Sequence, residues 1–273
     1  MPLLFLGDDA RKRPDPMLGW EEVMTQLIAW TRSPCKPHCH LRLGDGEFWS
    51  MLGGHPGHAR NGDNLGYFPE TLGKQLLAML HEIQRQAPNY GNLLVGGVWE
   101  SPPQSRELMD REQLWDGIPW CCAQGPITGV LWGTDTIDWL SLLALLPQRK
   151  VLVCNDRTKD ARYCFGAEHI SIPATDCWLD TARVLAEASA ILEQDPKAYF
   201  LWAASMAAEP WAWTLWQEFP ESCHVDVGHL FDAAFGIHNR IWSRNAGKPG
   251  DGRIEHYEQF FTPFVQRAIP EKA

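Results

Sequence analysis

The sequence lacks long apolar runs, a surplus of basic residues and a basic leader. Its longest apolar block, Leu140 to Leu146, is far shorter than a membrane span, and the first residues carry no basic segment of a signal peptide. The formal charge is −10, from 24 basic and 34 acidic residues, which argues against binding to nucleic acid by bulk electrostatic attraction. We therefore expect a cytoplasmic protein with no transmembrane segment and no nucleic-acid partner.

Familiar nucleotide-binding and disulfide patterns are also missing. No GxGxxG or Walker pattern follows an apolar run, which argues against nicotinamide and P-loop sites. The eight cysteines form no regular framework, and several lie in apolar runs, so we expect buried free thiols. One group, residues 35–40 (Cys-Lys-Pro-His-Cys-His), contains soft metal ligands. Because no second ligand pair with zinc-site spacing follows, we interpret it as a loop leading into the first strand.

Short apolar runs alternate with segments of helical periodicity along most of the 273 residues. This alternation predicts an α/β fold, with a Rossmann-like, mostly parallel sheet that has helices on both faces. The expected strands are residues 40–43, 92–98, 150–154, 168–172, 198–203 and 223–227. The expected helices are residues 17–31, 48–52, 69–83, 137–146, 177–192, 205–219 and 254–268. We also expect some helix within the polar connection over residues 99–117 and a short helix after Arg157.

The domain organisation follows from composition. We predict a single α/β domain over residues 1–244, in which residues 1–16 form an N-terminal arm. Residues 245–273 are predicted to form a glycine-rich linker and a helical tail. The aromatic residues of this tail could pack on their own domain or on a partner, which leaves a homo-oligomer open.

An acidic turn joins the first strand to the helix-like run that follows it. Gly44 and Gly46 are expected to adopt the positive φ of a tight turn and to let the backbone approach a ligand closely. Asp45 and Glu47 offer hard oxygen ligands that could hold one divalent cation together with substrate phosphates. An acidic glycine turn that binds no ligand and only faces solvent has the same pattern. The turn alone therefore does not distinguish a metal site from a solvated turn.

Other polar residues follow strands in the same way, and ligands of open parallel sheets bind beyond the carboxyl ends of the strands. These residues are Asn155 to Arg157, Ser205, and Asp226 to His229. Most of the 14 tryptophans lie at core spacing, so we expect them to pack in the interior. Trp49, Trp99 and Trp178 are predicted to lie nearer the ligand site.

Two of these segments carry a resemblance to a known family. Residues 42–48, Arg-Leu-Gly-Asp-Gly-Glu-Phe, resemble the Arg-x-Gly-Asp-Gly-Glu signature of the GT-D-fold glycosyltransferases, a bacterial domain formerly of unknown function. Residues 225–229, Val-Asp-Val-Gly-His, resemble the family's terminal Asp-x-Gly-His segment. The resemblance runs from about Arg42 to Gly236 and implies a GT-D-like fold.

The resemblance also implies a nucleotide-diphosphate sugar, in particular a UDP-sugar, as the donor substrate. It places Mn²⁺ or Mg²⁺ on Asp45 and Glu47. The residues that it implies for binding the donor are Arg42, Gly44, Gly46, Arg157 and Ser205. Two alternatives stay open: Arg42 could form an internal ion pair with Asp45 or Glu47, and Arg162 could replace Arg157 as the diphosphate contact.

An inverting transferase needs a base that takes the proton of the acceptor hydroxyl. Asp226 and His229 are the predicted catalytic residues, with Asp232 further along the chain. The alternative is that Asp226 caps the following helix and His229 is structural. Polar side chains of the loop after the acidic turn could meet the acceptor, namely His55, His58, Asn61 and Asp63.

The predicted function is that of a metal-dependent glycosyltransferase, specifically a hexosyltransferase. It would move a sugar from a UDP-sugar to a hydroxyl of a glycan or glycoprotein. One alternative is a metal-dependent phosphohydrolase or nucleotidyl transferase, which could use the same acidic turn. Another is a non-catalytic module that binds nucleotides or glycans.

Overall fold

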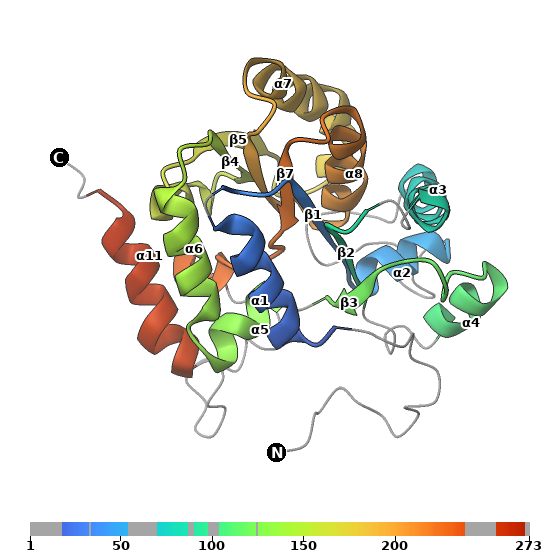
Figure 1. Cartoon of the computed structure of the whole chain (residues 1–273), viewed down its shortest axis with the longest axis horizontal. Coiled ribbons are helices and arrows are strands. Elements are labelled where there is room, and N and C mark those ends of the chain that lie inside the picture. Colours follow the sequence, from blue (N-terminus) through green and yellow to red (C-terminus); the bar gives the residue numbers. More distant parts are fainter. Residues whose placement is uncertain are drawn as a thin grey trace.

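The computed structural model of the chain describes residues 18–32, 34–53, 70–86, 90–97, 104–123, 125–237 and 255–270 (Figure 1). Within these residues, a seven-stranded sheet lies between two layers of helices. All of its strand pairs are parallel. The predicted α/β fold with a mostly parallel sheet is therefore confirmed.

The strand order of the sheet is β3-β2-β1-β7-β6-β4-β5. This order puts β1 beside β7, although the two are far apart in the sequence. Because all strands are parallel, their carboxyl ends share one edge of the sheet. The strands are β1 (His38–Leu43), β2 (Leu93–Gly97), β3 (Trp120–Cys122), β4 (Lys150–Asn155), β5 (Glu168–Ile172), β6 (Tyr199–Ala203) and β7 (Cys223–Asp226).

Two groups of helices cover the sheet (Figure 1). One face packs against α2 (Asp45–Met51), α3 (Glu70–Gln86), α4 (Gln104–Arg111), α7 (Thr181–Gln194) and α8 (Ala208–Glu218). The other packs against α1 (Trp20–Thr31), α5 (Gly125–Trp132), α6 (Asp135–Leu145), η3 (Lys159–Cys164), the π-helical turn η7 (Tyr257–Phe261) and α11 (Thr262–Ala268). Short 3₁₀ turns complete the described chain: η4 (Cys177–Asp180), η5 (Ser205–Ala207) and η6 (Asp232–Phe235).

Burial on both faces explains why the strands are apolar throughout. In β6, Phe200 and Trp202 belong to one hydrophobic cluster, whereas Tyr199 and Leu201 belong to the other. The core position expected for most tryptophans is confirmed, because seven of them are at most 5% exposed. These seven are Trp30, Trp120, Trp139, Trp202, Trp211, Trp213 and Trp216.

Two elements were missed by the sequence prediction. β3 has only three residues, which is too few for a periodic pattern to be recognised. α5 is apolar around most of its circumference and begins with Gly125-Pro126, so it lacks the alternation of faces that identifies a surface helix. Both lie after Ile118, in a stretch for which we predicted no element.

The C-terminal segment packs on its own domain. Tyr257, Phe261 and Val265 are fully buried, and the Tyr257 hydroxyl donates a hydrogen bond to the Leu230 carbonyl at 2.6 Å. The predicted division at residue 244 stays a prediction, because the arm over residues 1–16 and the linker over 245–252 lie outside the described residues. None of the described helices has the length and hydrophobicity needed to cross a bilayer.

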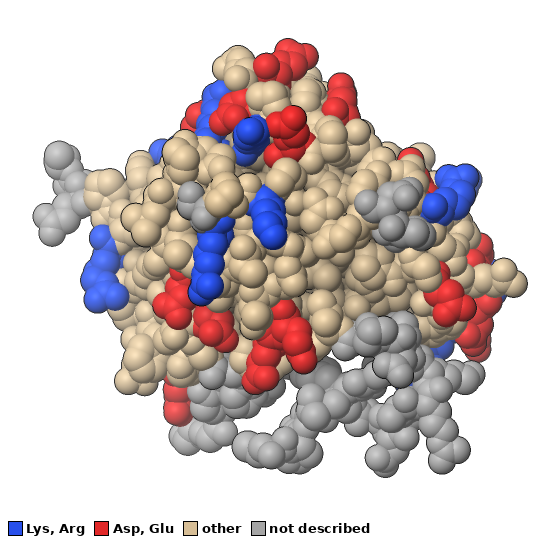
Figure 2. Space-filling model, viewed as in Figure 1, with Lys and Arg blue, Asp and Glu red and all other residues tan. Residues whose placement is uncertain are grey.

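The surface charge is dispersed. On the face in Figure 2, acidic and basic side chains stand in small groups among uncharged ones, and the described part of this face shows no continuous basic patch. This distribution agrees with the formal charge of −10.

Candidate functional site

A buried ion pair joins the carboxyl ends of β1 and β7. Nε of Arg42 donates to Oδ2 of Asp226 at 3.1 Å, and the two side chains are 9% and 1% exposed. The other carboxylate oxygen of Asp226 accepts a hydrogen bond from the backbone N–H of Gly228 at 2.7 Å. Burial opposes the charge on Arg42, but Asp226, Glu47 and Glu209 outweigh it and raise its pKa. Arg42 therefore stays charged and is paired with Asp226.

The acidic turn is tighter than expected. Gly44 alone separates β1 from α2, which begins at Asp45. The predicted positive φ at Gly44 and Gly46 is wrong, because Gly44 has φ −90° and Gly46 lies inside the helix without a positive φ. Gly44 instead leaves room for Glu47, since a Cβ there would lie 3.0 Å from its Oε2, a tighter contact than usual.

The two carboxylates of this turn have different environments. Glu47 is 4% exposed, and its Oε2 accepts a hydrogen bond from the Gly44 N–H at 2.6 Å. Burial raises the pKa of Glu47 to about 7, against the opposing effect of Arg42. Asp45 is exposed, and its Oδ1 accepts from the Gly46 N–H at 3.1 Å. Acids in a first helical turn are also stabilised by the helix dipole.

A third carboxylate of the site, Glu209 in α8, was missed by sequence reasoning. It is fully buried, and no N–H or O–H of the described residues donates to either of its oxygens. Burial raises the pKa of Glu209 well above the usual range, and Glu47 and Asp226 add to the effect. Glu209 is therefore a neutral acid that lies near Asp226 and Glu47. In the sequence, Glu209 stands out only because it is the single charged residue in the apolar run Met206–Trp213.

The charge balance of this group fits a divalent cation. Above about pH 7, where Glu47 is ionised and Glu209 stays neutral, three carboxylates (Asp45, Glu47 and Asp226) face the one positive charge of Arg42, which leaves two negative charges. Carboxylate oxygens are the ligands that Mg²⁺ and Mn²⁺ prefer. Among the described residues, no third His, Cys, Asp or Glu completes a ligand cluster at this turn. Phosphate oxygens or water would therefore fill the remaining coordination positions.

Two concavities lie along the same edge of the sheet and meet at Asn155, which lines both. The larger is an open cleft of about 450 Å³ at the ends of β4 and β5. It is lined by Asn155, Asp156, Arg157, Ser171, Ile172, Pro173, Ala174, Asp180 and Arg183. The smaller is a narrow hollow at the ends of β1, β4, β6 and β7, lined by Arg42, Asn155, Thr158, Ala203, Ser205, Gly228, His229 and Asp232.

The structure brings most of the predicted site residues to this edge. Ser205 lines the hollow with φ +53°, a conformation that L residues rarely adopt. His229 lines the same hollow and is half-buried, whereas Asp226 is almost fully buried. Arg157 is exposed at the cleft. Arg162 donates to the Tyr163 hydroxyl at 3.0 Å instead of lining the cleft.

Some candidates lie elsewhere. Trp178 is half-buried, and its Nε1 donates to the Thr71 hydroxyl at 3.2 Å. Trp49 is also half-buried. The remaining predicted contacts, His55, His58, Asn61, Asp63 and Trp99, lie outside the described residues.

Comparison with known proteins identifies the fold. No family model and no curated protein matches the sequence. A solved structure of a new glycosyltransferase (DUF1792) from Streptococcus sanguinis has 15% sequence identity and a TM-score of 0.53, over 79% of this chain and 82% of that one. A selenomethionine-substituted domain of unknown function 1792 has 14% identity and a TM-score of 0.52, over 79% of each chain. This chain has the DUF1792 fold.

The DUF1792 fold is the architecture that the two sequence motifs implied. A further DUF1792 structure, described as having a distinct glycosyltransferase fold, has 15% identity and a TM-score of 0.49, over 79% of each chain. The two structures with TM-scores of 0.52 and 0.53 establish the fold of this chain, and at 14–15% identity they establish the fold alone. The roles of the residues at the carboxyl edge of the sheet are argued from their own geometry.

The close contact between Gly228 and the guanidinium of Arg42 can be tested by substitution. Its φ is +51°, and a Cβ there would collide with the guanidinium of Arg42. Gly236 provides a matched control, because its φ is +73° and its Cβ would meet no atom within 4 Å. We expect Gly236→Ala to cost about 1 kcal/mol through its backbone conformation alone, and Gly228→Ala to cost about 2–4 kcal/mol because it also displaces Arg42. Urea unfolding measures both; equal losses would show that Arg42 does not pack on Gly228.

Proposed function

We propose that this chain is a metal-dependent glycosyltransferase, which transfers a hexosyl group from a UDP-sugar to a hydroxyl of a glycan or glycoprotein acceptor. The main support is the acidic turn, whose negative charge is not fully balanced by Arg42. The turn lies at the edge of the sheet that also holds the cleft. The DUF1792 fold adds support, because one structure with this fold is described as a glycosyltransferase.

In this proposal, Asp45 and Glu47 hold Mn²⁺ or Mg²⁺. The bound metal would neutralise charge on the diphosphate leaving group. Arg42, Gly44 and Gly46 would contribute to the phosphate side of the site. The cleft of about 450 Å³ is within the size range of small-ligand sites, and its Arg157 supplies a positive charge beside the nucleotide. Ser205 would contact the donor from the neighbouring hollow.

His229 is the better candidate for the base. Both oxygens of Asp226 already accept hydrogen bonds, one from Arg42 and one from Gly228. Asp226 thus holds Arg42 in place, whereas His229 lines the hollow and can take the proton of the acceptor hydroxyl. The acceptor oxygen then forms the new bond to the sugar carbon as the bond from that carbon to the diphosphate breaks.

The decisive measurement is calorimetric binding of UDP with and without Mn²⁺. We expect wild-type binding to require the metal, and the Asp45→Asn/Glu47→Gln variant to lose at least about 100-fold in affinity, because both oxygen ligands become neutral. Asp135→Asn is the matched control, since Asp135 is likewise the first residue of a helix, α6. Its UDP affinity should be unchanged.

Two results would contradict the proposal. Equal UDP binding by wild type and double variant without metal would separate the acidic turn from the diphosphate. Hydrolysis of simple phosphodiesters without any acceptor would favour a phosphohydrolase instead, and product analysis by mass spectrometry detects it.

A further inference from the structure

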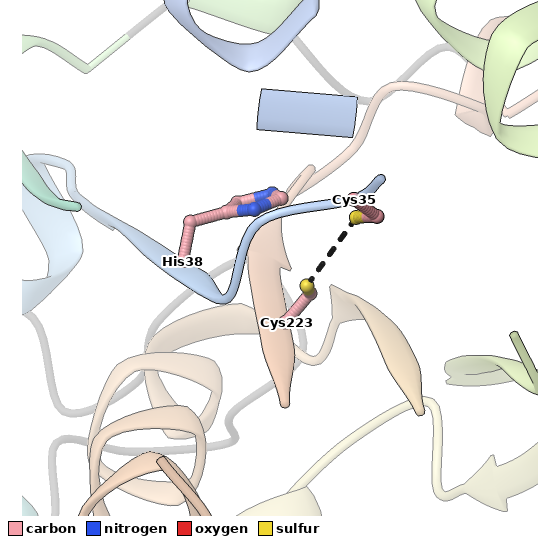
Figure 3. Close-up of side chains that lie close together, drawn as sticks. All are labelled: Cys35, His38 and Cys223. Atoms are coloured by element: carbon pink, nitrogen blue, oxygen red, sulfur yellow. Dashed lines mark hydrogen bonds between the residues drawn. The ribbon is translucent and has the colours of Figure 1, made fainter. Parts of the chain in front are cut away.

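A second group of ligand-type side chains lies at the opposite, amino edge of the sheet. Cys35 precedes β1, His38 is the first residue of β1, and Cys223 is the first residue of β7. Their ligand atoms all lie within 4.8 Å of one another (Figure 3). In the part of the chain that the structure describes, no other three His, Cys, Asp or Glu side chains come so close. Cys223 is the distant ligand that the sequence pattern around Cys35 did not reveal.

The sulfur separation matches a tetrahedral metal site. The Sγ atoms of Cys35 and Cys223 are 3.8 Å apart (Figure 3). Two thiolates at the usual zinc–sulfur distance of about 2.3 Å, at a tetrahedral angle, lie about 3.8 Å apart. A disulfide would need the sulfurs to approach to about 2.05 Å. The pair is therefore already spaced for a shared cation.

A hydrogen bond to a backbone carbonyl orients the His38 ring in the way that is usual for metal-binding histidines. Its Nδ1 lies 2.7 Å from the Lys36 carbonyl oxygen, which can only accept, so Nδ1 carries the hydrogen and Nε2 keeps a lone pair. A backbone carbonyl on the second ring nitrogen is the usual support of such a ligand. Nε2 lies 2.8 Å from the Tyr199 hydroxyl. That hydroxyl also lies 3.4 Å from the Thr31 hydroxyl oxygen, so it has another partner when Nε2 binds a cation.

Charge and access favour occupation of the site. An imidazole whose Nδ1–H donates to a carbonyl and whose Nε2 keeps its lone pair is neutral, and the contacts of His38 fit this tautomer. Two thiolates, one neutral imidazole and one divalent cation sum to zero charge, which limits the cost of burying the group. His38 and Cys223 are buried, whereas Cys35 is half-exposed and gives solvent a route to the site.

We propose that Cys35, His38 and Cys223 form a binding site for a soft d¹⁰ cation, with Zn²⁺ the best fit. Water fills the fourth position. Binding one Zn²⁺ displaces the two thiol protons to solvent and links the segment before β1 to the start of β7. The site is separate from the acidic turn and does not depend on the proposed transferase activity.

Cobalt titration of the reduced, metal-free full chain tests this proposal, because thiolate-bound Co²⁺ has a near-ultraviolet charge-transfer band that oxygen-bound Co²⁺ lacks. We expect one equivalent of Co²⁺ with this band, its displacement by Zn²⁺, and about two protons released per metal ion. Cys35→Ala and Cys223→Ala should each weaken binding by more than about 100-fold, a loss greater than that for a supporting group. Cys164→Ala, which removes a buried free thiol outside the group, should bind as tightly as wild type.

Three outcomes would overturn the proposal. Cobalt could bind without the thiolate band, or Cys35→Ala could bind it as tightly as wild type. The reduced protein could also take up no metal, while thiol titration and peptide mapping of the oxidised protein show a Cys35–Cys223 disulfide. Urea unfolding of the metal-free variants confirms that a loss of binding does not come from unfolding.

Discussion

Replacing Arg42 with methionine is expected to lower the free energy of unfolding by about 3–5 kcal/mol at about pH 8. Methionine keeps much of the apolar stem but removes the positive charge that faces Asp226, Glu47 and Glu209. Asp226 is 1% exposed, so its carboxylate would remain buried with only the Gly228 N–H as a donor. An unpaired buried charge costs far more than a lost surface contact.

The loss should shrink in acid, because the pKa of Glu47 is raised to about 7 and its protonation removes part of the unbalanced charge. Urea unfolding at about pH 8 and pH 5.5, with the m-value checked for constancy, measures this difference. Arg183→Met is the matched control: Arg183 pairs with Asp180 and Glu187, but its side chain is 42% exposed. Its cost should stay below about 1 kcal/mol. A smaller loss for Arg42→Met than for Arg183→Met would refute the buried-charge argument.

The metal affinity of the acidic turn is expected to fall about tenfold for each pH unit below about 7, or about 100-fold between pH 7 and pH 5. The pKa of Glu47 is raised to about 7, chiefly by burial. Below that pH the metal must displace a proton from Glu47, whereas above it the carboxylate is already ionised. An exposed glutamate, with its pKa near 4.3, would keep its affinity almost constant over this range.

Calorimetric titration of Mn²⁺ in the presence of UDP, repeated between pH 5 and pH 8, measures this slope. Glu47→Gln should bind weakly at every pH and show no such slope. Without metal, stability should change in the opposite direction: the folded state binds the Glu47 proton more tightly than the unfolded state, so stability falls as the pH rises through 7. A flat metal affinity between pH 5 and pH 7 would mean that Glu47 is not a ligand.

Most of the sheet could be predicted from local sequence, because a strand buried on both faces is a continuous apolar run. All six residues of β4 are buried, and its run was recognised on that basis. β3 failed this criterion because it is an edge strand of three residues. The turn after β1 was mispredicted because its glycines suggested positive φ, whereas Gly44 serves close packing against Glu47.

The site was only partly predictable, for a different reason. Short motifs identify residues that are neighbours in sequence, such as Asp45 and Glu47. They do not identify a partner from the other end of the chain. The pairing of Arg42 with Asp226 and the approach of Cys223 to Cys35 join residues 184 and 188 positions apart. Glu209 acquires its properties only when α8 buries it beside Asp226.

The place of β7 between β1 and β6 has a consequence during synthesis. Among the described strands, β7 is the last to leave the ribosome, yet it lies in the middle of the sheet. Until then β1 has an open edge, which can pair with other chains. Contacts of such long sequence range form slowly and prolong this exposure. Nascent chains that stop before Cys223 therefore lack both Asp226 and the closed sheet, and they leave one edge of β1 unpaired.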